Sequence, residues 1–85
     1  MKYQIEELLH SNNIKYNYEI DYEGRQTYYF DIEDKKISIK IIPADFFATY
    51  KQKQYIIIDN EYIKFESIND IQNIFRNIKL NEILK

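Results

Sequence analysis

The chain has 85 residues and no cysteine, and its formal net charge at pH 7 is −2. This length predicts one domain, residues 1–85, with a single core and modest stability. The lack of cysteine excludes disulfides, thiol nucleophiles and cysteine metal sites. The longest apolar run, residues 55–58, is far shorter than the ~20 residues that span a bilayer, and the first residues lack the apolar stretch of a signal peptide. We therefore expect a cytoplasmic protein with no membrane partner.

Ile, Lys, Asn and Tyr are unusually frequent, with 17, 10, 8 and 9 residues. All four have AT-rich codons, so the bias indicates a low-GC bacterial genome. Tyrosine also offers a large contact area at low entropy cost, which suits binding surfaces. Because codon bias explains part of the tyrosine content, the positions of the tyrosines are more informative than their number.

Residues 2–11 predict a short helix, because Ile5, Leu8 and Leu9 share one face. Asn12 and Asn13 are expected to end it, since asparagine tolerates the left-handed backbone conformation. The following residues 14–22 alternate apolar and polar side chains, a pattern typical of a half-buried strand.

The alternation returns over residues 28–32 and 37–41, so three successive strands predict an antiparallel meander. A shared apolar face requires an odd-length first turn, expected at residues 23–25 around the only glycine, and a two-residue second turn at 34–35. These registers place Tyr18 and Ile39 near Phe30. They also pair Lys15 with Glu33, Asn17 with Asp31, Lys36 with Glu33, and Lys40 with Tyr29.

Residues 43–54 interrupt this pattern and predict a short helix or a loop. Pro43 cannot donate a ladder hydrogen bond and often opens a helix. On such a helix Phe46, Phe47 and Tyr50 share one sector. The segment then serves either as a lid on the core or as an aromatic docking surface.

A second hairpin is expected from residues 54–58 and 62–66 around Asp59-Asn60, followed by a helix that Ser67 and Asp70 cap. The pattern leaves open whether this hairpin extends the first sheet. The predicted class is α+β, with about five antiparallel strands, an N-terminal three-stranded meander and a helix at each end. The predicted order is α-β-β-β-(short α or loop)-β-β-α.

No motif for catalysis, cofactor binding or metal binding is found in this sequence, so we expect a protein that is not an enzyme. A single glycine excludes Gly-rich phosphate loops, and the lone His10 is expected at the surface. The first hairpin carries four carboxylates that form either a solvated, charge-balanced face or an acidic patch: Glu19, Asp21, Asp31 and Glu33.

Some apolar side chains remain after the predicted core is filled. Tyr29 and Ile42 point away from it, and residues 55–58 are apolar on both sides of their strand, so one side requires cover. A helix, segment 43–54 or another chain would supply that cover. The partner-binding candidates are Tyr29, Lys40, Phe46, Phe47, Tyr50, Lys51 and Lys53.

The expected function is a small, non-enzymatic interaction protein that binds another protein. In size and composition the chain is similar to small inhibitor and accessory proteins of phages and mobile elements, including some anti-CRISPR proteins. One alternative is a single-stranded nucleic-acid binder that uses Tyr29, Lys36, Lys40 and lysines 51 and 53. Such binding is expected to be weak, because the chain is polarised rather than basic. The other alternative is a self-associating structural protein, as a homodimer, through the Ile57 strand or the 43–54 aromatics.

Overall fold

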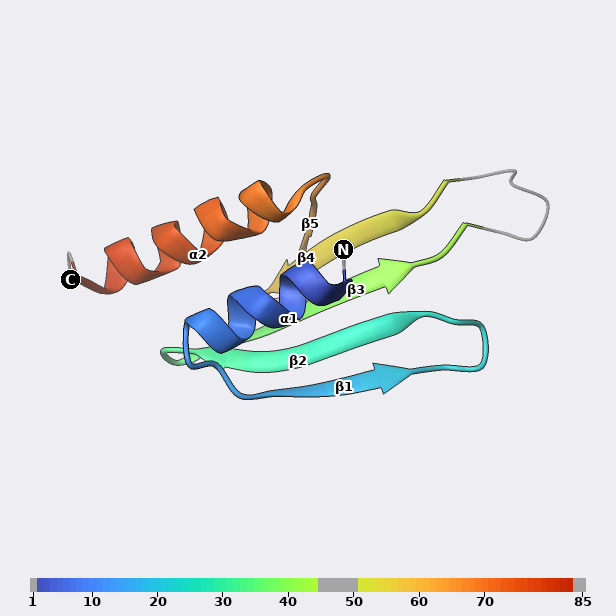
Figure 1. The fold of residues 1–85 in the computed structure, drawn as a ribbon. Coiled ribbons are helices and arrows are strands. Elements are labelled where there is room, and N and C mark those ends of the chain that lie inside the picture. Colours follow the sequence, from blue (N-terminus) through green and yellow to red (C-terminus); the bar gives the residue numbers. More distant parts are fainter. Residues whose placement is uncertain (1, 45–50, 84–85) are drawn as a thin grey trace.

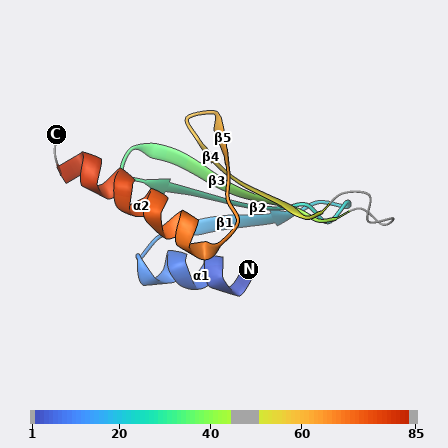
Figure 2. The ribbon, with the colours of Figure 1, turned by 90° about the horizontal axis from the view of Figure 1, so that it is seen from above.

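The computed structural model describes residues 2–44 and 51–83, with side chains as far as Ile78. In these residues five strands form one antiparallel sheet, and both helices pack on the same face of it (Figures 1 and 2). The predicted α+β class and element order are therefore confirmed. The elements are α1 (Lys2–Ser11), β1 (Tyr16–Ile20), β2 (Gln26–Ile32), β3 (Lys35–Ile42), β4 (Lys53–Ile58), β5 (Glu61–Lys64) and α2 (Ile68–Ile83).

The strand order β1-β2-β3-β4-β5 is a continuous meander. The second hairpin extends the first sheet, because β4 pairs with β3 from Ile37–Ile58 to Ile42–Lys53. The predicted turn at Asp59-Asn60 is confirmed, and both residues have positive φ values of 50° and 69°. Such values favour the tight two-residue hairpin turns that match strand twist.

The first hairpin turn is odd in length, as predicted, but lies one residue earlier, at residues 22–24. The two carboxylate oxygens of Asp21 fix the turn at this position. Oδ1 accepts hydrogen bonds from the backbone N–H groups of Glu23 and Arg25 at 2.9 Å, and Oδ2 accepts one from Arg25 Nε at 2.7 Å. Gly24 then takes the left-handed position, with φ 83°. As a result, Tyr18 lies opposite Tyr28, and Phe30 lies opposite Tyr16.

The second turn has two residues, as predicted, but they are Glu33 and Asp34. This register places Phe30 opposite Ile37 and Tyr28 opposite Ile39, so Ile39 shares the buried face with Phe30 at a diagonal position. The earlier turn leaves Lys35 in β3, where its Nζ lies 3.2 Å from Asp59 Oδ2. The predicted pairs change accordingly: Asp31 faces Lys36, Tyr29 faces Ser38, and Lys40 faces Thr27.

The core lies between the helices and one face of the sheet. Ile5 and Leu9 of α1 are fully buried, as are Tyr28, Ile39 and Ile56 on the strands. The rings of Phe30 and Phe75 of α2 meet edge to face at 5.7 Å. The Tyr28 hydroxyl donates a 3.1 Å hydrogen bond to Glu6 Oε1, so the buried phenol has a polar partner.

The helix ends show how local sequence sets the element bounds. Asn13 has φ 56°, and Ile14 N donates to Leu9 O at 2.9 Å, which is the Schellman arrangement. At α2 the Asp70 carboxylate accepts hydrogen bonds from the backbone N–H groups of Glu66 and Ser67 at 2.9 and 3.2 Å. Asp70 is therefore the capping side chain. Within the described residues, the Ser67 hydroxyl makes no such bond, contrary to the prediction.

Candidate interaction surface

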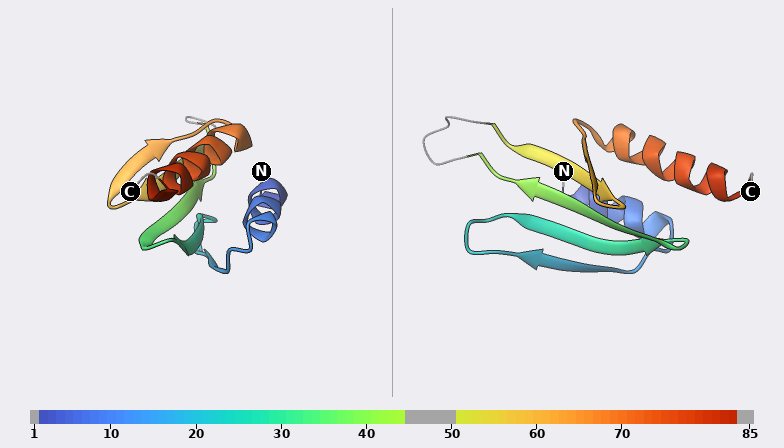
Figure 3. Two further views of the ribbon diagram at one scale, coloured as in Figure 1. Left: turned by 90° about the vertical axis from the view of Figure 1, so that its left-hand side faces the viewer. Right: turned by 180° about the vertical axis from the view of Figure 1, so that it is seen from behind.

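The sheet face opposite the helices, called the open face below, has no described helix over it (Figure 3, right). The strand pairs arrange its side chains in rows that cross the sheet from β1 to β5. The central row consists of Asn17, Tyr29, Ser38, Ile57 and Tyr62. A solvated sheet face usually carries polar residues, so a row with two tyrosines and an isoleucine is unusual there.

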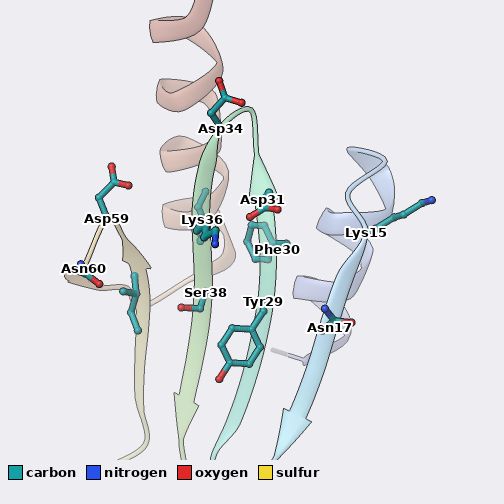
Figure 4. Close-up of a pocket in the computed structure, with 12 residues that line it drawn as sticks. Lys15, Asn17, Tyr29, Phe30, Asp31, Asp34, Lys36, Ser38, Asp59 and Asn60 are labelled. Atoms are coloured by element: carbon teal, nitrogen blue, oxygen red, sulfur yellow. The ribbon is translucent and has the colours of Figure 1, made fainter.

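Both aromatic side chains of the central row are exposed, as is Asn17 at its end. Tyr29 is 43% exposed and Tyr62 is 64% exposed, whereas Ile57 and Ser38 are half-buried. Figure 4 shows Tyr29 standing on β2 beside the small Ser38 of β3. In the middle of the open face an aromatic ring therefore lies next to a small side chain.

A second set of four residues, called the charged row below, crosses the open face near the β2–β3 turn. Asp31 and Lys36 are direct cross-strand partners. Lys15 precedes the Tyr16–Phe30 pair by one residue, at the level of Asp31, and Asp59 follows the Ile37–Ile58 pair by one residue, at the level of Lys36. The sign of the charge thus alternates from β1 to β4.

The charged row and Tyr29 line a shallow hollow of about 720 Å³ (Figure 4). Among the described residues, no ion pair joins two members of this row, although Asp59 pairs with Lys35. Asp31 and Lys36 are both exposed. Their charged groups are therefore accessible to a partner.

A third row contains Glu19, Thr27, Lys40, Tyr55 and Lys64. The ring of Tyr55 meets that of Tyr62 edge to face at 6.0 Å. Lysines beside two aromatic rings form the kind of surface on which single-stranded nucleic acids stack.

The acidic hairpin is divided between separate interactions. Desolvation would raise the pKa of Asp21, but hydrogen bonds from Arg25 and the Glu23 backbone outweigh it and hold that pKa below its usual value. Its carboxylate is thus engaged within its own turn. Asp31 belongs to the charged row, Glu19 lies opposite Thr27 in the third row, and Glu33 lies in the next turn. The four carboxylates therefore do not converge on one point.

The predicted partner-binding residues are only partly placed together. Tyr29 and Lys40 lie on the open face, and Lys53 begins β4 at its exposed end. Lys51 is exposed just before β4. Phe46, Phe47 and Tyr50 lie outside the described residues, so the helix-or-loop prediction for residues 43–54 is tested only at its ends, where Pro43 and Ala44 have no regular structure.

Two surface residues, Ser38 and Tyr62, were missed by the sequence prediction, whereas Ile57 was expected only as part of a self-associating strand. Ser38 lies beside Tyr29 because of the β2–β3 register, and Ile57 and Tyr62 join the same row because the second hairpin extends the sheet. The alternation in β4 and β5 places Ile57 and Tyr62 on a common side, and this signal identifies them once the strand order is known.

The described residues contain no group of three His, Asp or Glu side chains positioned to hold a metal ion. His10 is exposed, as predicted, and contacts the Tyr16 ring edge to face at 5.8 Å. No described helix has both the length and the apolar character needed to cross a membrane.

Comparison of the chain with protein-family models, curated proteins and solved structures finds no match. A functional proposal therefore depends on the open face itself.

Proposed function

We propose that this chain is a small, non-enzymatic interaction protein that binds another protein through the open face. The observation that supports this is the central row, where Tyr29 and Tyr62 are exposed beside Ile57. Tyrosine is enriched among the residues that dominate binding energy. The central row would be the apolar middle of the interface, and the charged row would be part of its polar rim.

A role as an inhibitor or accessory protein of a phage or mobile element, acting in the cytoplasm of a low-GC bacterium, is part of this proposal. Its basis is the small size and the biased composition. Such a protein would act by occupying a partner's surface, which requires an exposed face rather than a catalytic group.

Affinity capture from a bacterial lysate, with and without nuclease, tests the proposed function. A variant with Tyr29→Thr and Tyr62→Thr keeps good strand formers and should lose the captured protein. The matched control replaces Tyr3 and Tyr22, which are 83% and 94% exposed but lie off the open face, and should retain it. Equal capture by both variants would refute the role of the open face.

A second candidate function is binding of single-stranded nucleic acid, favoured by Lys40 and Lys64 beside Tyr55 in the third row. The net charge of −2 and the presence of only two arginines oppose tight phosphate binding. Any affinity for a random oligonucleotide should be weaker than micromolar at ~150 mM salt. Sub-micromolar binding in a fluorescence anisotropy titration would reverse the order of the two candidates.

A further inference from the structure

The charged row is complementary to itself under a two-fold rotation. Consider two copies packed open face to open face, with the axis parallel to the strands and between β2 and β3. The strand order of one copy is then reversed over the other, so β2 lies over β3 of the second copy and β1 over β4. Each contact occurs twice, as in every two-fold interface.

In this arrangement every member of the charged row meets the opposite charge. Asp31 lies over Lys36 of the partner subunit, and Lys15 lies over Asp59 of the partner subunit. Because Asp59 already pairs with Lys35 within its own chain at 3.2 Å, Asp31 and Lys36 provide most of this complementarity. An axis through β3 instead would set Lys36 over its own copy and Asp31 over Asp59 of the partner subunit. Like charges in contact disfavour that placement. Among axes that lie between two strands, the one between β2 and β3 pairs all four members of the charged row with opposite charges.

The central row fits the same axis. Tyr29, which is 43% exposed, lies over Ser38 of the partner subunit, so a large side chain meets a small one. Asn17 lies over Ile57 of the partner subunit. Alternation of large and small side chains across facing positions is what allows two layers to interdigitate.

We propose that a second copy of this chain covers the open face, giving a β-sandwich dimer with the helices on the outside. This inference rests on the part of the proposed function that makes the open face a protein-binding surface, and it takes a second copy of this chain as the protein bound there. The net charge of −2 per chain is small, so long-range repulsion between two copies is weak. With this axis β1 to β4 of the two copies overlap and β5 lies outside, so the shared face is three inter-strand spacings wide, roughly 14 Å at about 4.8 Å each, which is small for a standard interface. Dissociation in the micromolar range is therefore expected.

Charge-reversed variants test the dimer by analytical ultracentrifugation. Asp31→Lys makes positions 31 and 36 both positive, and Lys36→Asp makes both negative. Each variant alone then brings like charges together across the interface and should dimerise at least about tenfold more weakly. An equimolar mixture should recover the dimer, because each positive pair then meets a negative one. Glu7→Lys and Arg76→Glu make the same charge changes on exposed helix positions and should dimerise like the wild type.

Three outcomes overturn the inference: a wild-type chain that stays monomeric up to about 500 µM, variants that dimerise normally, or a mixture that does not recover. The proposed function fails separately. A monomeric chain that captures another protein through Tyr29 and Tyr62 keeps the proposed function and refutes the dimer. A monomeric chain whose capture is unaffected by these tyrosines refutes both.

Discussion

Ile56 and Ile57 are neighbours on β4 that provide a matched test of the one-sided sheet. Ile56 is fully buried in the core, whereas Ile57 is half-buried on the open face. Substitution of either residue by alanine makes the same chemical change on the same strand. The difference between the two variants therefore reports how much each face is packed.

The expected magnitudes follow from burial. Ile→Ala removes three carbons, worth about 2.4 kcal/mol at about 0.8 kcal/mol each, and a residual cavity raises the cost of Ile56→Ala to about 3–4 kcal/mol. A chain of this size has a total stability of only about 4–13 kcal/mol, so Ile56→Val, at about 1 kcal/mol, is the milder companion variant. Ile57→Ala should cost about 1 kcal/mol or less, because part of that side chain already meets water.

Urea unfolding followed by circular dichroism measures these differences. The protein should be kept at about 1 µM, below the expected dimer dissociation constant. Equal losses for Ile56→Ala and Ile57→Ala would refute the reasoning, because Ile57 would then be covered within a single chain. At high concentration Ile57→Ala should also weaken dimerisation, whereas Ile56→Val should not.

Three further predictions concern local structure. Asp70→Asn should lower the melting temperature more than Ser67→Ala, since the Asp70 carboxylate caps α2; equal shifts would contradict this assignment. Gly24→Ala should lower the free energy of unfolding by about 1 kcal/mol in urea titrations, because φ is 83°. Its new Cβ would meet Pro43 at an ordinary 3.6 Å, so a larger loss would indicate a clash instead. Burial and the hydrogen bond to Glu6 raise the pKa of Tyr28, so the folded state favours the neutral phenol. The contribution of this group to the free energy of unfolding is therefore present below pH about 10 and decreases as the pH rises further. Tyr28→Phe should be less stable at pH 7 but lose less stability above pH 10 in thermal melts.

Elements with local signals could be predicted well. The predicted helix at 2–11 coincides with α1, because the apolar spacing and the left-handed Asn13 are both encoded nearby. The turn at Asp59-Asn60 is equally local. In contrast, the role of Asp70 was only half predicted, since the helix-start pattern does not say which of its two polar side chains makes the bonds.

The turn positions could not be predicted from alternation. If the turn of a hairpin moves by one residue, each strand residue pairs with a partner two positions away from its former one. Because side chains alternate with a period of two, every side chain keeps its face. The apolar pattern is therefore identical for turns at 23–25 and 22–24. The carboxylate of Asp21, which bonds to Glu23 and Arg25, decides between them.

The same two-residue shift determines what the open face offers to a partner. With the predicted second turn, Asp31 would face Ser38, and Tyr29 would face Lys40. In the observed register Asp31 faces Lys36, and Tyr29 faces Ser38. The predicted register would lack both the Asp31–Lys36 pair of opposite charges and the pairing of the large Tyr29 with the small Ser38, which make the open face complementary to itself. The two registers bury the same side chains, because Phe30 and Ile39 lie on the core side of the sheet in either case. Variants that move the β2–β3 turn would therefore alter association while leaving the core pattern intact.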